Sequence, residues 1–100
     1  MKTFVLKILT PERTAFDGAA ERLTVTDTKG LVSVLSGHAP MVAVLAPGPL
    51  QIALPGGAVR HGMASGGILH VTREETAVLI DSFEWEDGSK DIPRSGNSET

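Results

Sequence analysis

The sequence predicts an all-β domain, folded as a sandwich or a barrel. Short apolar stretches recur at a spacing of roughly ten residues, and glycine, proline or aspartate separates them. Several stretches alternate apolar with polar residues, as at Leu23 and Val25, which is the period of a strand with one buried face. No stretch shows a sustained helical period. The 11 glycines and 6 prolines among 100 residues supply the turns that such a chain needs.

The first expected strand is Phe4–Leu9, in which Phe4, Leu6 and Ile8 share one face at period two. A short segment then leads to Asp17-Gly18. Aspartate followed by glycine is typical of a tight hairpin turn, so we expect the chain to reverse there.

The later stretches of strand character are each bounded by turn residues: Glu21–Thr26, Leu31–Leu35, Met41–Leu45, Leu50–Leu54, Ala58–Ala64, Ile68–Thr72 and Thr76–Ile80. Asp27-Thr28-Lys29-Gly30 forms a tight turn between the first two of these. Met41–Leu45 contains no polar residue, so we expect it to be buried on both sides, or to turn one side to a partner. After Asp81 the sequence becomes polar and aperiodic. We therefore expect a domain at residues 1–84 and a polar, disordered tail at residues 85–100.

Composition excludes several classes of protein. The net charge is −3 and no basic stripe with interleaved aromatic residues occurs, which argues against nucleic acid as a partner. The absence of cysteine removes disulfides and thiolate metal sites. The longest apolar run, residues 39–47, is far shorter than the ~18 residues of a membrane span. Any contact with a membrane is therefore expected to come through a partner.

The three histidines are the natural candidates for chemistry near neutral pH. His61 and His70 lie in strands, and alternation sends both to the solvent face or to a strand end. His38 differs, because Gly37 and Pro40 frame it in a loop. No serine has a nucleophile-elbow context, no convergent metal ligands occur and no glycine-rich phosphate loop is present. The sequence thus predicts no catalytic residue, no cofactor and no metal site, which leaves non-catalytic binding.

Motifs in a fixed order connect this chain to a known family. Gly37-His38-Ala39-Pro40 is followed by Pro47-Gly48, then by Ser65–Val71 and Val78–Asp81, and Phe16-Asp17-Gly18 precedes them all. In order and spacing, from about Lys2 to Glu84, the chain resembles the epsilon subunit of bacterial and chloroplast F-type ATP synthases, whose mitochondrial counterpart is called delta.

The resemblance implies a ten-stranded β-sandwich of two antiparallel sheets. It implies a non-catalytic rotor subunit in the central stalk, which couples the gamma subunit to the c-ring during proton- or sodium-driven ATP synthesis. The alpha/beta hexamer would be an indirect partner. The expected place is the cytoplasmic face of the bacterial inner membrane, where the subunit is held peripherally by the ATP synthase complex.

The same resemblance assigns two sets of contact residues. The c-ring set comprises Thr28, Lys29, Gly30 and Leu31, and the gamma-subunit set comprises His38, Ala39, Pro40, Met41, Val42 and Ala43. Typical members continue into a helical hairpin, but nothing after Asp81 has helical periodicity, so no ATP-sensing inhibitory role is expected. The alternative is a free-standing β-sandwich that binds protein or carbohydrate. The scarcity of aromatic residues argues against it.

Overall fold

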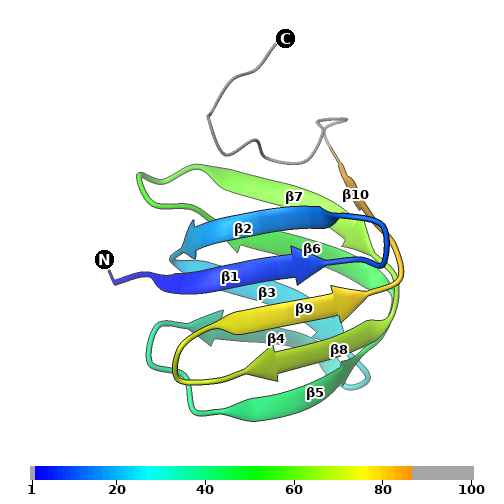
Figure 1. Cartoon of the computed structure of the whole chain (residues 1–100), viewed down its shortest axis with the longest axis horizontal. Coiled ribbons are helices and arrows are strands. Elements are labelled where there is room, and N and C mark those ends of the chain that lie inside the picture. Colours follow the sequence, from blue (N-terminus) through cyan, green and yellow to red (C-terminus); the bar gives the residue numbers. More distant parts are fainter. Residues whose placement is uncertain (1, 87–100) are drawn as a thin grey trace, which may run out of the picture.

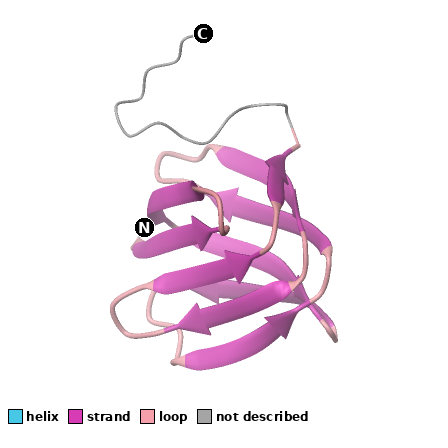
Figure 2. Ribbon diagram, turned by 45° about the vertical axis from the view of Figure 1, so that its right-hand side comes forward, coloured by secondary structure: helices cyan, strands magenta, loops and turns pink. Residues whose placement is uncertain are grey.

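The computed structural model describes residues 2–86, and all regular secondary structure in that range is β-strand (Figure 1, Figure 2). The expected all-β fold of ten strands is therefore confirmed. In chain order the strands are β1 (Phe4–Leu9), β2 (Thr14–Ala20), β3 (Arg22–Asp27), β4 (Gly30–Leu35), β5 (Met41–Leu45), β6 (Gly48–Ala53), β7 (Val59–Ala64), β8 (Gly67–Val71), β9 (Thr76–Ile80) and β10 (Phe83–Trp85). Residues 2–86 contain no helix long and apolar enough to cross a membrane.

Nine strands form one hydrogen-bonded path, β4 branches from it at β3, and the whole folds into two facing layers (Figure 1). The β3 sheet has the order β10-β7-β6-β3-β4, and the β8 sheet has the order β5-β8-β9-β1-β2. The layers join where β3 meets β5, at the pair Asp27 and Leu45. One feature departs from the expected pair of antiparallel sheets: β1 lies between β9 and β2 and runs parallel to β9. The N-terminal strand is thus held inside a sheet and not at its edge.

The two layers enclose a hydrophobic core that follows the predicted alternation. Leu6 and Ile8 of β1 are 0% exposed, and so is Leu23 of β3. Burying such a side chain completely contributes about 1.5–3 kcal/mol relative to leaving it in water. The largest fully buried side chains are Leu6, Ile8, Leu23, Val25, Val34, Leu50, Ile52, Leu69 and Val78. They come from both sheets, so the core fixes the two layers against each other.

The hairpin turn expected at Asp17-Gly18 is wrong. Both residues lie inside β2, where Asp17 is opposite Lys7 and Gly18 is opposite Leu6. Gly18 has no positive φ, so it is ordinary extended backbone. The chain reverses earlier, at residues 10–13, where the backbone N–H of residue 10 donates to the carbonyl of residue 13 at 2.9 Å. An extended β2 pairs its backbone with β1 over the whole strand, and this outweighs the local turn preference.

The expected domain boundary after Glu84 is wrong, because the sandwich also includes Trp85. Trp85 belongs to β10 and is only 5% exposed. Its ring packs edge-on against Phe83 with the ring centroids 4.8 Å apart, and the guanidinium carbon of Arg60 lies 4.2 Å from the Trp85 ring centroid. These contacts bury an aromatic side chain that composition alone had placed in a polar segment. Residues 87–100 of the expected tail lie outside the described residues.

Candidate contact surfaces

The first candidate surface is the tip of the β3–β4 hairpin, which the resemblance assigned to the c-ring. Thr28, Lys29, Gly30 and Leu31 are all exposed, and Leu31 is 69% exposed. The Oδ1 atom of Asp27 accepts a hydrogen bond from the backbone N–H of Lys29 at 2.7 Å. Gly30 has a φ of 132°, a conformation that favours glycine. The tip is therefore a fixed turn that holds an apolar side chain in water.

The second candidate surface begins at the loop from β4 to β5. Gly37 has a φ of 84°, and the backbone N–H of His38 donates to the carbonyl of Leu35 at 3.0 Å. The ring atom Nδ1 of His38 lies 2.7 Å from the carbonyl oxygen of Ala39. Because a carbonyl can only accept, Nδ1 carries the proton. Local bonds and the ring of Pro40 thus shape this loop, as its sequence indicated.

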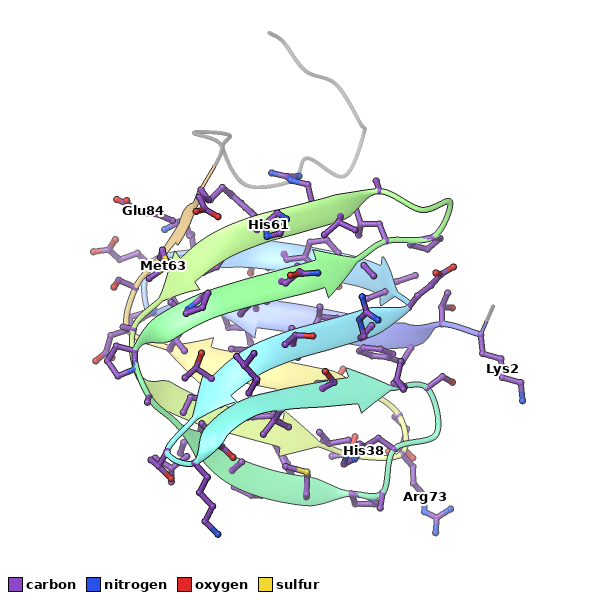
Figure 3. The ribbon with its side chains drawn as sticks, turned by 180° about the vertical axis from the view of Figure 1, so that it is seen from behind. Lys2, His38, His61, Met63, Arg73 and Glu84 are labelled. Atoms are coloured by element: carbon purple, nitrogen blue, oxygen red, sulfur yellow. The ribbon has the colours of Figure 1, made fainter. Side chains whose placement is uncertain are left out.

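An open cavity of about 560 Å³ lies beside His38. Residues 3–5, residues 35–40 and residues 71–76 line it, and Figure 3 shows His38 and Arg73 near each other on two loops at one end of the sandwich. The lining mixes both signs of charge with apolar groups. Within residues 2–86, no group of three or more His, Cys, Asp or Glu side chains is placed to hold a metal. The cavity is therefore a surface hollow without a distinctive chemistry.

The other two histidines lie on the outer faces of the sandwich. His61 of β7 and His70 of β8 are both exposed, which confirms the prediction from alternation. Figure 3 shows His61 and Met63 together on the outer side of the β3 sheet. His61 and His70 belong to different sheets, so they face in opposite directions and cannot act on one substrate.

Strand β5 was expected to be buried on both sides, and in the isolated chain this is wrong. Leu45 is buried, and Met41 and Ala43 are half-buried against the core. Val42 and Val44 point the other way and are 65% and 63% exposed. In a sandwich of two layers each strand has one outward face, so an all-apolar strand must expose half of its side chains. The other option expected for this strand, a side turned to a partner, matches this arrangement.

The exposed valines belong to a larger group on the outer face of the β8 sheet. Val44 is opposite Ile68 across β5 and β8, and Ile68 is opposite Leu79 across β8 and β9. Ile68 and Leu79 are each 44% exposed. We call Val42, Val44, Ile68 and Leu79 the apolar sheet face. Contiguous apolar side chains at a surface are typical of a site that a partner covers.

Sequence reasoning placed Val42 in the gamma-subunit set but missed Val44, Ile68 and Leu79. It named the strands that contain these three residues but gave none of the three a role in contact. A signal was present, because Ile68 stands next to Leu69 and Leu79 next to Val78, and in a strand neighbours face opposite ways. Where both neighbours are apolar, one of them must point away from the core.

The fold and its surfaces define a small β-sandwich domain with an apolar outer sheet face. Residues 3–86 match the family model described as ATP synthase, Delta/Epsilon chain, beta-sandwich domain. The chain belongs to this family. The resemblance derived from the ordered motifs is therefore confirmed.

Curated relatives carry the name ATP synthase epsilon chain. That of Clostridium novyi is 38% identical over 84 residues, which cover 84% of this chain and 64% of the relative. That of Ruminococcus albus is 38% identical over 99 residues, covering 98% of this chain and 72% of the relative. That of Rhodopseudomonas palustris strain BisB5 is 38% identical over 81 residues, covering 81% of this chain and 59% of the relative. This chain thus spans between 59% and 72% of the length of these three relatives.

Two solved structures share the fold. A chain of the Euglena gracilis mitochondrial ATP synthase superposes with a TM-score of 0.82 at 22% identity, covering 88% of this chain and 56% of that chain. A chain of the Tetrahymena thermophila mitochondrial ATP synthase, in a structure of the central stalk and c-ring, gives a TM-score of 0.68 at 15% identity, covering 83% of this chain and 66% of that chain. At these identities the likeness concerns the sandwich itself.

Proposed function

We propose that this chain provides the β-sandwich of a non-catalytic rotor subunit in the central stalk of an F-type ATP synthase. In this role it contacts the gamma subunit and the c-ring and rotates with them while protons or sodium ions drive ATP synthesis. Family membership and the names of the relatives support the assignment. The observation that carries it is the apolar sheet face, whose four side chains are 44–65% exposed and need a partner to cover them.

The proposed gamma-binding surface consists of the His38 loop, residues 36–40, together with the apolar sheet face. Val42 belongs to the apolar sheet face and to the expected gamma-subunit set, and it lies close to the loop along the chain. Met41 and Ala43 point toward the core, so within the expected set they position Val42 and do not themselves touch gamma. Each side chain of the apolar sheet face projects from a strand paired on at least one side, so little conformational freedom is lost there on binding.

The proposed c-ring surface is the hairpin tip at residues 28–31. It lies at one end of β4, and the His38 loop follows the other end. Strand β5 returns along the molecule, so that Leu45 lies opposite Asp27 at the base of the tip. Paired strands therefore connect the two contact surfaces. A force applied at one surface is transmitted to the other through hydrogen-bonded strands and not through a flexible linker.

Both contacts are with other subunits, so the proposal needs no direct contact between this chain and lipid. The chain would lie peripherally at the cytoplasmic face of the bacterial inner membrane, and the alpha/beta hexamer would be reached only through gamma. The proposal gives no residue a catalytic, cofactor or metal role. The sandwich acts as a rigid connecting piece.

The test is binding to recombinant gamma subunit from the same organism. The 100-residue chain is mixed with gamma at moderate salt, and the mixture is analysed by size-exclusion chromatography with light scattering. Co-elution of one copy of each is expected. Separate elution of two folded proteins would overturn the proposal. Met41→Asp is expected to unfold the domain or weaken binding, since it places a charge against the core.

A further inference from the structure

The β3 sheet ends in a strand with a free edge. Within the described residues β4 pairs only with β3, through register pairs that run from Asp27 and Gly30 to Arg22 and Leu35. The carbonyl of Thr26 accepts a hydrogen bond from the backbone N–H of Ala46, on the side of β3 that faces away from β4. Consecutive residues of a strand direct their backbone groups to opposite sides, so the N–H and C=O groups of Asp27 face β4. Antiparallel ladders alternate hydrogen-bonded and non-hydrogen-bonded pairs.

It follows that Gly30, Val32 and Val34 bond to β3. Leu31, Ser33 and Leu35 instead direct their N–H and C=O groups to the free edge. Of these groups, the carbonyl of Leu35 already accepts from the N–H of His38.

This edge lacks the usual protection against pairing. Edge strands of soluble proteins are commonly very short, charged, interrupted by proline or covered. At the opposite end of the same sheet, β10 has 3 residues, and the Nη2 atom of Arg13 donates to the carbonyl of Phe83 at 2.9 Å. By contrast β4 has 6 residues, Gly-Leu-Val-Ser-Val-Leu, without a charge or a proline. Leu31 and Leu35 are 69% and 50% exposed beside the unpaired backbone.

The sequence of β4 has a symmetry that fits one occupant of this edge. Residues 31–35 read Leu-Val-Ser-Val-Leu, the same in both directions about Ser33. We propose that β4 pairs antiparallel with β4 of a second copy of this chain, about a two-fold axis at Ser33. In that register Ser33 meets Ser33, and Leu31 of each copy meets Leu35 of the other.

Backbone and side chains both satisfy this register. The residues that meet are those whose N–H and C=O groups face outward, so the two Ser33 residues exchange hydrogen bonds with each other. The N–H of each Leu35 reaches the carbonyl of Leu31 in the second copy. On the outer face the exposed leucines become cross-strand neighbours, and on the inner face Val32 meets Val34. No like charges oppose each other. A shift by one residue would place inward-pointing backbone groups at the junction and lose this match.

The dimer goes beyond the proposed place in the stalk and does not depend on it. Pairing through β4 covers Leu31, which the proposed c-ring surface also uses. We therefore assign the dimer to the free chain, whose exposed edge it protects until another partner takes over Leu31.

The first test measures self-association by sedimentation velocity of the whole chain from about 10 μM to about 1 mM, a range suited to a small interface. A concentration-dependent doubling of mass is expected. Ser33→Pro removes the central N–H, which β3 does not use, and should weaken dimerisation at least tenfold. Ser33→Ala is the matched control. It also loses the hydroxyl contact with Thr24 at 3.1 Å but keeps the N–H, so it should still dimerise.

A charge exchange identifies the two-fold axis. Ser33→Lys and Ser33→Glu should each be monomeric because like charges meet, and an equimolar mixture should recover a dimer. Circular dichroism confirms that each variant is folded. A wild-type chain that stays monomeric at about 1 mM overturns the proposal. So does a dimer that Ser33→Pro and the two charged variants leave unchanged, because its interface lies elsewhere.

A disulfide provides an independent readout, because the chain has no cysteine of its own. In the proposed register the two Ser33 Cα atoms are about 5.5 Å apart, within the range that a disulfide spans. Ser33→Cys should therefore form a covalent dimer on mild oxidation. Gln51→Cys, on the same outer face but away from the free edge, should not. Equal rates of cross-linking for the two variants would contradict the β4 interface.

Discussion

Val44 of β5 and Ile68 of β8 lie directly opposite each other, and both side chains point into water, 63% and 44% exposed. Leu79 of β9 extends the same row across a third strand. On the solvated face of a sheet such positions are usually polar, as Thr24 and Gln51 are on the β3 sheet. The row lies outside the core and stays largely in water in the isolated chain. Its composition fits the proposed contact with a partner that removes it from water.

Val44→Asp should abolish most of the binding to gamma while leaving the domain folded. The side chain lies outside the core, so the free energy of unfolding should change by less than about 1 kcal/mol. At the interface, the new carboxylate would be buried without a partner, and the affinity should fall at least tenfold, as isothermal titration calorimetry would measure. Val59→Asp is the matched control, since Val59 is 42% exposed on the outer face of the β3 sheet. Equal losses for the two variants would contradict the assigned face.

Most strands could be predicted from the sequence, because the core imposes period two and turn residues delimit each stretch. Met41–Leu45 and Thr76–Ile80 were expected with the same bounds that β5 and β9 have. The failures share a cause. At Asp17-Gly18 the local preference for a turn competes with pairing to β1, and only the fold shows that pairing wins. Trp85 lies in a strand of 3 residues, too short to show a period.

The contact surfaces were less accessible to sequence reasoning. The motifs pointed to the loop at His38 and the tip at residues 28–31, whose roles remain predictions. The apolar sheet face was not anticipated, because it combines β5, β8 and β9, which are separated along the chain. Nothing in a run such as Thr76–Ile80 tells which apolar side chain meets the opposite sheet. That choice depends on the layer the strand joins.

Leu31→Ala and Leu79→Ala should have reciprocal effects on the two proposed partners. Leu31 is 69% exposed at the hairpin tip, and Leu79 is 44% exposed on the apolar sheet face. Losing apolar area at an interface weakens only the contact that buries it. Leu31→Ala should reduce capture of this chain alone by c-rings in nanodiscs, and leave binding to gamma intact. Leu79→Ala should do the opposite. A loss of both contacts in either variant would show that the two surfaces are not separate.

Leu23→Ala should destabilise the domain strongly. Leu23 is 0% exposed in β3, between Val34 of β4 and Ile52 of β6. Removing its side chain leaves a cavity in the core, at a cost of about 2–5 kcal/mol of unfolding free energy. Urea unfolding followed by Trp85 fluorescence would measure it. Leu79→Ala removes the same atoms at a half-exposed site and should cost less than about 1 kcal/mol. Similar losses for the two variants would mean that Leu23 is not a core residue.

Gly62→Ala should displace β10 from the edge of the β3 sheet. A methyl group on Gly62 would overlap the ring of Phe83, and it would also lie 2.9 Å from the carbonyl oxygen of Glu84. The ring cannot move away without losing its contact with Trp85, so the strand has to shift as a unit. Trp85 is the only tryptophan in the chain. Its emission should therefore move to longer wavelength as the indole ring enters water.

Gly18→Ala is the control for this substitution. Gly18 also lies in a strand without a positive φ, but a methyl group there would make only an ordinary contact, 3.6 Å from the ring of Phe16. Its emission spectrum should match that of the wild type. The contact of Arg60 with the indole ring adds a second readout, because a shifted β10 breaks it and exposes Trp85 to an acrylamide quencher. If Gly62→Ala kept the wild-type spectrum and quenching, the packing of β10 against β7 would be looser than the contact of Phe83 with Gly62 implies.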